Sequence, residues 1–132
     1  MVQVVSQELK IKGGKKKQRD LTEKIVKFAI KNLFPKVKKY NIKIRLNNKN
    51  NCFEWEDRIY EINIDKKQEE DDFITAIFHE LVHVKQYIRK EPMERVKFPI
   101  TWEEYINLPE EKEAFKLQEE LFLKWKHKNN YK

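Results

Sequence analysis

The pentapeptide H-E-L-V-H at positions 79–83 constrains this chain more than any other segment. Apolar residues surround it from position 73 to position 88, and no Gly or Pro interrupts the run before Pro92, so the pattern predicts a long buried helix. Helical residues four positions apart lie one above the other. His79 and His83 therefore point into the same space, where two imidazoles can share one metal ion.

The glutamate of the same motif suits a catalytic role. Glu80 sits roughly 60–100° around the helix from both histidines, close enough to reach a metal-bound water without binding the metal. This arrangement is typical of a metal-dependent hydrolase in which the carboxylate is the general base. The alternative is a pair of core histidines one turn apart, which would be costly to bury beside a carboxylate.

The third ligand is expected on a later helix, because a catalytic zinc site usually has three protein ligands and one position for water. A helical pattern begins at Pro109, and its first turns carry Glu110, Glu111 and Glu113. At ~100° per residue, Glu111 lies on the side of the apolar residues and Glu113 lies roughly opposite. A core-facing carboxylate needs a partner, so Glu111 is the predicted ligand, with Glu113 and His127 as alternatives.

These two segments resemble those of gluzincins, the zinc metallopeptidases whose third ligand is a Glu on a later helix. Residues 79–87 (HELVHVKQY) and 108–115 (LPEEKEAF) are similar to segments of small SprT-like metallopeptidases of bacteriophages. The resemblance implies peptidase activity and one Zn²⁺ ion held by His79, His83 and Glu111. It also implies an intracellular protein, located in the host cytoplasm if a phage encodes it.

The chain departs from these families at two positions. Glu110 stands where the phage proteins often have Trp. Phe115 stands four residues after the predicted ligand, where many gluzincins carry an Asp. The group that orients the histidines is therefore left unassigned by the sequence. The similarity covers roughly residues 70–116, with specific motifs at each end and little between them.

Periodicity elsewhere predicts an α+β fold. A helical stripe covers residues 21–34, with Asp20 as a candidate N-cap and Pro35 after its end. Three strands, which we expect to form an antiparallel sheet, are predicted at residues 40–46, 52–56 and 58–65. Together with the H-E-x-x-H helix and the C-terminal ligand helix, they make a minimal zincin-like domain over residues 20–132.

Two features of the predicted site remain open. Residues 91–108 form a long connection between the ligand helices, and loops of this length are often functional. We expect it to wall the catalytic cleft, and a packed crossover is the alternative. A tetrahedral intermediate also needs a hydrogen-bond donor beyond the metal, for which Tyr105, Tyr87 and His127 are candidates.

Positive charge is concentrated in the first part of the chain. Residues 1–50 contain 15 Lys and Arg against 3 Asp and Glu, whereas the whole chain has a net charge of +7. Residues 10–19 hold both glycines, so residues 1–19 are predicted to be a flexible basic arm. Such an arm can contact nucleic acid without sequence preference, and a solubilising tail is the alternative. No aromatic residue lies within the Lys tract, which removes the stacking component of a single-strand site.

Composition narrows the remaining classes. The 132 residues suit one domain, no stretch is long enough for a membrane span, and the first residues lack a secretory signal pattern. A single cysteine, Cys52, excludes an internal disulfide framework and favours a cytoplasmic location. The sequence thus predicts a zinc-dependent peptidase acting on a protein or peptide substrate. A catalytically silent protein- or nucleic-acid-binding module and a hydrolase of non-peptide bonds are the alternatives.

Overall fold

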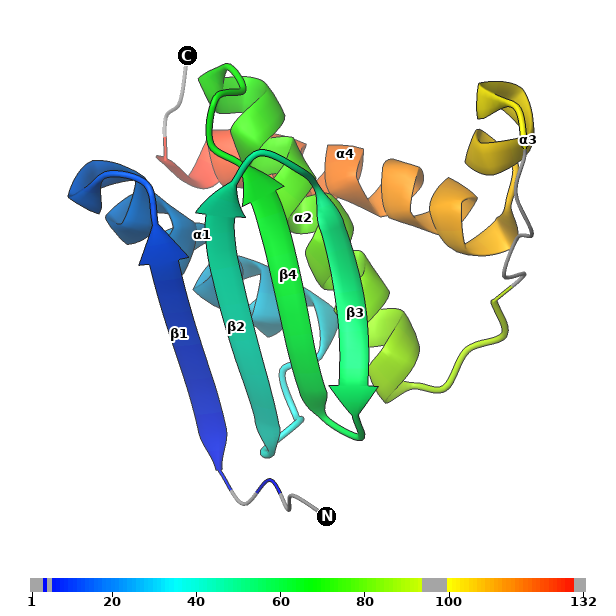
Figure 1. Cartoon of the computed structure of the whole chain (residues 1–132), viewed down its shortest axis with the longest axis horizontal. Helices are drawn as coiled ribbons and strands as arrows, with labels where there is room; N and C mark the ends of the chain where they lie inside the picture. The colour runs from blue at the N-terminus through cyan, green and yellow to red at the C-terminus, as the bar shows by residue number, and fades with distance from the viewer. Residues whose placement is uncertain (1–3, 5, 94–99, 130–132) are drawn as a thin grey trace.

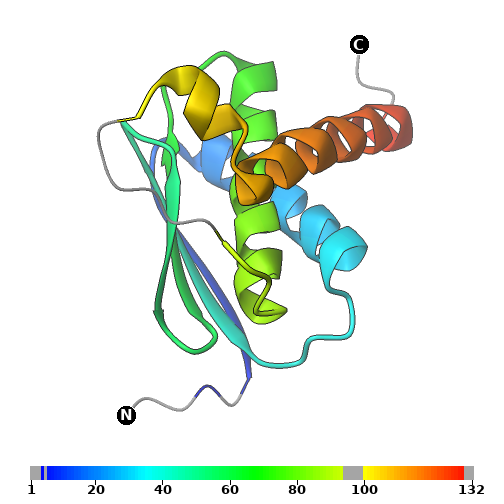
Figure 2. The ribbon, with the colours of Figure 1, turned by 90° about the vertical axis from the view of Figure 1, so that its right-hand side faces the viewer.

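The structure is a computed structural model that describes residue 4 and residues 6–93 and 100–129. Within these residues the chain forms a four-stranded mixed sheet with helices on one of its faces (Figures 1 and 2). In chain order the elements are β1 (Gln7–Gly13), α1 (Lys16–Leu33), β2 (Tyr40–Asn47), β3 (Asn51–Glu56), β4 (Ile59–Asp65), α2 (Glu70–Ile88), α3 (Trp102–Ile106) and α4 (Pro109–Asn129). The expected combination of helices and strands is confirmed.

The sheet differs from the three-stranded antiparallel sheet that was expected. Its strand order is β1-β2-β4-β3, in which β1 is parallel to β2, β2 is parallel to β4, and β3 is antiparallel to β4. β4 takes an inner position between β2 and β3, and of its residues on the face away from the helices only Asn63 is buried. Ile62 and Ile64 face the core, and Asn63 on the other face bonds the side chains of Asn47 and Asn51 at 2.7 Å each.

The prediction of a flexible arm over residues 1–19 is wrong for most of its described part. Gln7–Gly13 is strand β1, and α1 already begins at Lys16. Leu9 and Ile11 of β1 lie opposite Ile42 and Ile44 of β2 and pack against the core. The domain therefore starts before residue 20. The Lys-rich composition obscured a short period-2 alternation in which two apolar residues face inward and the lysines face outward.

The two glycines form the turn between β1 and α1 instead of loosening the chain. Gly13 has φ +88° and Gly14 has φ +63°, a region that favours glycine. A Cβ atom on Gly13 would lie 2.5 Å from the carbonyl oxygen of Leu46. Because α1 starts this early, Asp20 is not its N-cap but lies within the helix, where it pairs with Lys16 at 3.0 Å.

α1 and α2 cover one face of the sheet, and α4 packs across both of them (Figure 2). The Trp125 ring of α4 meets Phe28 of α1 and Phe78 of α2 edge-on, with ring centroids 5.4 and 6.4 Å apart. This aromatic contact fixes the position of α4 relative to α2. The centre of the core consists of fully buried aliphatic side chains: Ile25, Val26, Ile42, Ile44, Ile62, Ile64, Ile74, Ile77 and Leu81.

Candidate metal centre

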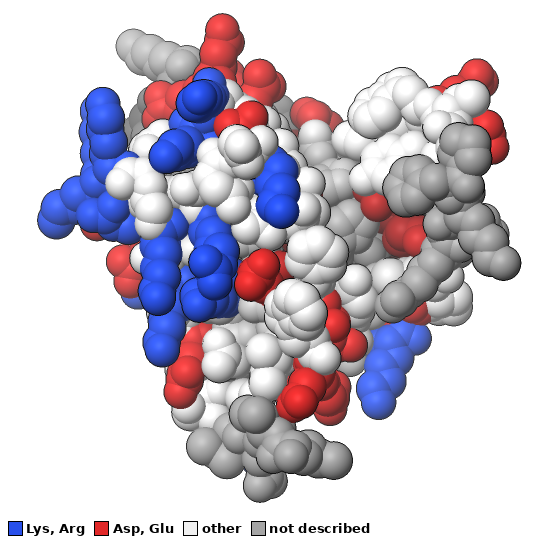
Figure 3. Space-filling view, viewed as in Figure 1, with Lys and Arg blue, Asp and Glu red and all other residues white. Residues whose placement is uncertain are grey.

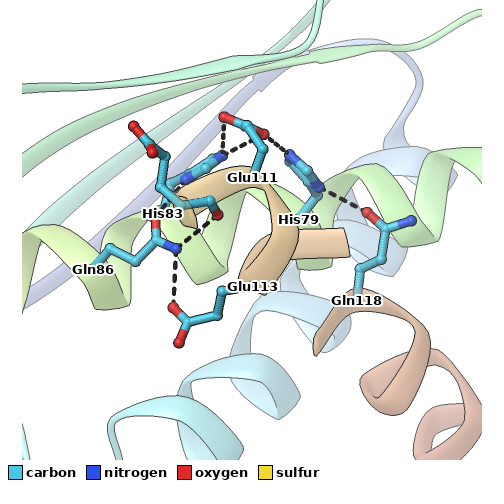
Figure 4. Close-up of polar contacts among 7 residues, drawn as sticks. His79, His83, Gln86, Glu111, Glu113 and Gln118 are labelled. Carbon is cyan, nitrogen blue, oxygen red and sulfur yellow. Dashed lines mark hydrogen bonds and ion pairs between the residues drawn. The ribbon is translucent and has the colours of Figure 1, made fainter. Parts of the chain in front are cut away.

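The helix predicted around the H-E-x-x-H motif is α2, and both of its histidines point toward the first turn of α4 (Figure 4). Oε1 of Glu111 lies 2.9 Å from Nε2 of His79 and 3.3 Å from Nε2 of His83. Its Oε2 lies 3.2 Å from Nε2 of His83. All three residues are buried, and one ligand atom from each lies within 4.8 Å of the others. This group could hold a metal ion.

Local packing explains why Glu111 reaches the histidines. Pro109 occupies the first position of α4, which suits its fixed φ. Ala114 is fully buried, and its small side chain lets α4 approach α2 closely. One turn after Glu111, the ring of Phe115 lies against the imidazole of His79, with centroids 4.7 Å apart. The position where many gluzincins carry an Asp therefore packs against the ring of His79 and does not accept a hydrogen bond from it.

Two glutamines contact the outer nitrogens of the histidines. Oε1 of Gln118 lies 2.7 Å from Nδ1 of His79, and Oε1 of Gln86 lies 2.6 Å from Nδ1 of His83 (Figure 4). Outer bonds of this kind orient metal-binding imidazoles. Neither glutamine was predicted from the sequence as a partner of the histidines. Gln86 lies three residues after His83 and Gln118 seven after Glu111, so helical spacing on the ligand faces could have identified both.

The position of Gln86 determines which nitrogen of His83 carries a hydrogen. Nε2 of Gln86 donates to the backbone carbonyl of Glu110 and to the carboxylate of Glu113, each at 2.9 Å. Both groups only accept hydrogen bonds, so the amide oxygen must face His83 and its Nδ1 must be the donor. Nε2 of His83 is then free to act as a ligand, and it is directed at Glu111.

Two of the ligand-atom separations are close to those found around a bound metal ion. In a tetrahedral site with metal–ligand distances of about 2.0–2.2 Å, neighbouring ligand atoms lie about 3.3–3.6 Å apart. The separations between the Glu111 carboxylate and the two imidazole nitrogens, 2.9 and 3.3 Å, are within a few tenths of an ångström of this range. Imidazole lone pairs and a carboxylate converging on one point repel each other unless a proton or a cation bridges them.

Without a metal, that bridge is a proton. Burial lowers the pKa of His83, but the hydrogen bond with Glu111 and the charges of Glu80 and Glu111 outweigh this effect and raise the pKa to about 9. Burial raises the pKa of Glu111, but hydrogen bonds with His79 and His83 outweigh it and lower the pKa to about 2. At neutral pH the metal-free site is thus an ion pair, and a metal ion must displace its proton.

Glu80 is buried beside the three residues of this group. Burial raises its pKa, the charges of His79 and His83 lower it in part, and the charge of Glu111 raises it further. The net effect is a pKa above the usual value for a glutamate. A carboxylate with a raised pKa is a stronger base than an ordinary glutamate, which suits proton transfer.

A cavity of about 350 Å³ lies next to the site, and Glu80, His83 and Glu111 form part of its wall. Residues 50–53, in and before β3, line it as well. The connection between α2 and α4 completes the lining with Met93, Ile100, Tyr105 and Leu108. The described part of this connection therefore walls the cavity, as expected, and includes the short helix α3; residues 94–99 lie outside the described residues.

Of the three candidate donors for an oxyanion, Tyr105 is the one that contacts the His₂Glu group, through Glu111. It lines the cavity, and its pKa is raised by burial, by the charge of Glu111 and by a hydrogen bond to that carboxylate. Tyr87 also lines the cavity, with its ring stacked on Tyr60 at a centroid distance of 6.0 Å. His127 is exposed in the last turn of α4, about 24 Å along the helix from Glu111, so it is remote from the site.

The alternative ligand Glu113 has other partners. Its carboxylate lies 2.8 Å from Nζ of Lys85 and accepts a hydrogen bond from Gln86 at 2.9 Å. Burial by itself raises the pKa of Glu113. The hydrogen bonds from Lys85 and Gln86 and the charge of Lys85 outweigh this effect, so the pKa is lowered. Among the described residues, Glu111 is thus the carboxylate that reaches both histidines.

Comparison with protein-family models, with curated proteins and with solved structures finds no match to this chain. Across the described helices, none combines the length and the apolar composition that crossing a membrane requires. The class of the protein therefore follows from its fold and its site alone. It is a mixed α/β protein with a buried His₂Glu group that could hold a metal ion, beside a cavity of about 350 Å³.

Proposed function

We propose that this chain is a zinc-dependent peptidase with a minimal zincin-like domain of the gluzincin type, similar to SprT-like metallopeptidases. The observation that carries the proposal is the convergence of His79 and His83 on Glu111 from two separate helices. Glutamine side chains bond the outer nitrogens of both imidazoles. Burying so many polar groups is unfavourable, and a core that served packing alone would not contain them.

Zinc suits this set of donor atoms. Two imidazoles and one carboxylate are the protein ligands of a common class of catalytic zinc site, in which the fourth position stays open. His83 and Glu111 border the cavity, so a metal ion held by these residues would be within reach of a substrate. When bound, zinc lowers the pKa of a coordinated water and polarises the scissile carbonyl.

Glu80 is the proposed general base. It lines the same cavity as His83 and Glu111, and its raised pKa makes the carboxylate a stronger base than an ordinary glutamate. In this role it takes a proton from the attacking water and passes it to the leaving amine. A site that bound metal for structural reasons alone would not require a carboxylate at this position.

Tyr105 is the proposed donor to the oxyanion of the tetrahedral intermediate. Its raised pKa keeps the hydroxyl protonated at every pH at which a peptidase would work. The hydroxyl bonds the Glu111 carboxylate, and metal binding to that carboxylate would weaken this bond and free the hydroxyl for a substrate.

The proposed substrate is an extended peptide or an unfolded protein. β3 pairs with β4 along one edge, and in the described part of the chain its other edge has no strand partner. Residues 51–53 of this strand line the cavity. A peptide paired with the free edge would be held mainly by main-chain hydrogen bonds, which gives a loose sequence preference.

Hydrolysis of a fluorogenic peptide library and of an unfolded protein, with and without a chelator, tests the proposal. The zinc-loaded protein should cleave, and the chelator should abolish cleavage. Glu80→Gln should keep zinc and lose hydrolysis, Tyr105→Phe should lower kcat about 10²–10³-fold, and the exposed Glu120→Gln should behave like the parent.

Cleavage that survives both the chelator and Glu80→Gln would contradict the proposal. Zinc bound in full without cleavage of any peptide would favour the alternative, a catalytically silent binding module. Cleavage of ester or amide substrates that are not peptides, in place of peptides, would favour the third class of hydrolase.

A further inference from the structure

The face of the sheet opposite the helices is open to solvent (Figures 1 and 2). In β2 the residues at even positions from Tyr40 to Leu46 are buried, so Lys43 and Arg45 point to the open face. The parallel register places Lys10 of β1 beside Lys43 and Lys12 beside Arg45. Four cations from two segments about thirty residues apart thus form one cluster on this face.

Like charges directly opposite each other on neighbouring strands destabilise a sheet. Within the described residues, Arg45 contacts Glu61 at 3.6 Å, whereas Lys10, Lys12 and Lys43 form no ion pair. The charges of Arg45 and Lys12 lower the pKa of Lys43, which reflects how closely the cations are placed. Such a cluster is costly for the protein alone and favourable for an anionic ligand.

Two exposed aromatic residues lie on the same face, on strand β3. Phe53 is opposite Glu61 of β4 and therefore points to the open face, and Trp55 lies next to it, with ring centroids 6.0 Å apart. The side chains are 43% and 66% exposed, respectively. β3 is two strands from β2, or about 10 Å. The two rings therefore lie within reach of a polymer whose backbone follows the cations.

Figure 3 shows how charge is distributed on this face. Lys and Arg side chains gather over β1 and β2, and toward β3 uncharged side chains lie beside them together with several Asp and Glu side chains. Glu8 and Glu61 also point to the open face, and Glu61 is the partner of Arg45. The face thus combines a basic strip with an aromatic strip parallel to it.

We propose that the open face of the sheet binds single-stranded nucleic acid, with phosphates on Lys10, Lys12, Lys43 and Arg45 and bases stacked on Phe53 and Trp55. Cations that follow the backbone and aromatic side chains that stack on bases are the two components of single-strand binding. A duplex hides the faces of its bases, so the exposed rings favour an unpaired strand over a duplex. This proposal does not depend on the metal site.

The sequence alone argued against stacking, because no aromatic residue lies within the Lys tract. The sheet supplies the missing component, since it brings β3 to the same face as β1 and β2. β3 also lines the cavity at the metal site. A strand bound on the open face would therefore lie next to the entrance of that cavity.

Fluorescence anisotropy of a short labelled oligothymidylate, titrated with the full chain, tests the proposal. We expect binding at low salt, with a slope of log K against log salt of roughly −3 for four phosphate contacts. Lys12→Glu/Lys43→Glu should weaken binding at least tenfold and reduce this slope. Trp55→Ala should weaken binding about tenfold and leave the slope unchanged.

The matched control is Lys24→Glu/Lys31→Glu, the same charge change on exposed lysines of α1, on the helical side of the molecule. This variant should bind within twofold to threefold of the parent. All the substituted side chains are on the surface, so every variant should keep its fold. Circular dichroism and thermal unfolding check this.

Any of the following results would overturn the proposal: no binding at low salt, equal weakening by the two charge-reversal variants, normal binding by Trp55→Ala, or equal affinity for a duplex of the same length. Binding of poly-glutamate as tight as that of the oligonucleotide would also overturn it, because it would assign the face to acidic polymers in general.

Discussion

The helix pair α2–α4 and the open face of the sheet bring their polar side chains together in different ways. In the helix pair, His79 and His83 come from one turn of one helix, and a second helix adds Glu111. On the sheet, Lys10 and Lys43 become neighbours through strand pairing alone. The first group is buried, with its charges neutralised within the group, and the second is exposed, with like charges side by side.

This difference separates two kinds of evidence for a ligand. In the helix pair, the evidence is a set of acceptor atoms that converge and need a cation between them. On the sheet, the evidence is repulsion between neighbouring cations, which an anion relieves. Each region can be altered without touching the other, so the two assignments are tested independently.

The largest effect is expected from removal of the carboxylate that links the two helices. Glu111→Ala should weaken zinc binding by more than 100-fold, because loss of a direct ligand exceeds the 10–100-fold loss typical of an outer partner. Competition with a fluorescent zinc chelator measures the affinity. Glu113→Ala, two residues away, is the control and should lose much less affinity, because Gln86 keeps its hydrogen bond to the Glu110 carbonyl and so still orients His83. If both variants lost the same zinc affinity, Glu111 would not be distinguished as a metal ligand from its neighbour Glu113.

The pH dependence of stability in the metal-free protein tests the ion pair between His83 and Glu111. The pKa of His83 is raised to about 9 in the fold from 6.5, so protonation of His83 stabilises the fold fully below pH 6.5. This stabilisation is lost as the pH rises through 9 and amounts to up to about 3 kcal/mol. Urea unfolding in the presence of a chelator, between about pH 6 and pH 10, measures it.

The control for this titration is His83→Asn, in which the loss between these pH values should largely disappear. Unfolding free energies that stay constant in the parent protein across this range would show that His83 and Glu111 do not form the ion pair.

Gly13→Ala tests whether the basic N-terminal segment belongs to the sheet. The substitution places a Cβ atom 2.5 Å from a backbone oxygen of β2 at φ +88°, so it should lower the free energy of unfolding by about 2–3 kcal/mol. Chemical denaturation measures this, with the exposed Lys17→Ala as a nearly neutral control. If Gly13→Ala were as stable as the parent, residues 7–13 would not be part of the sheet and would form the flexible arm first expected. Lys10 and Lys12 would then not lie beside Lys43 and Arg45.

The smallest of these effects should come from the glutamine behind His79. Gln118→Leu removes the acceptor for Nδ1 and should weaken zinc binding about 10–100-fold, with little loss of folding stability. Gln118→Glu keeps an acceptor at the same place and should restore most of the affinity. If both variants bind zinc equally well, the glutamine does not orient the imidazole.

The sequence predicted the helix pair better than the sheet, and the reason is physical. The spacing of His79 and His83 and the side of the helix that carries Glu111 follow from helical geometry within single segments. Which strands become neighbours depends on contacts between distant segments. The burial of Asn63 and the inner position of β4 therefore could not be derived from alternation in any one strand.

Composition misled the prediction at the N-terminus. Lysines and glycines there are typical of a flexible tail, but Leu9 and Ile11 are enough to add a parallel strand when α1 returns the chain to the same sheet. The outer partners Gln86 and Gln118 were missed for another reason. Glutamine is common on helix surfaces, and its role here depends on where the neighbouring helix packs.

A crystal structure of the zinc-loaded protein, with anomalous scattering recorded at the zinc absorption edge, tests the central claim most directly. One anomalous peak per chain is expected, about 2.0–2.1 Å from Nε2 of His79 and of His83 and about 2.0–2.2 Å from a carboxylate oxygen of Glu111. A zinc ion bound elsewhere, or these two imidazoles turned away from each other around an unchanged α4, would contradict it.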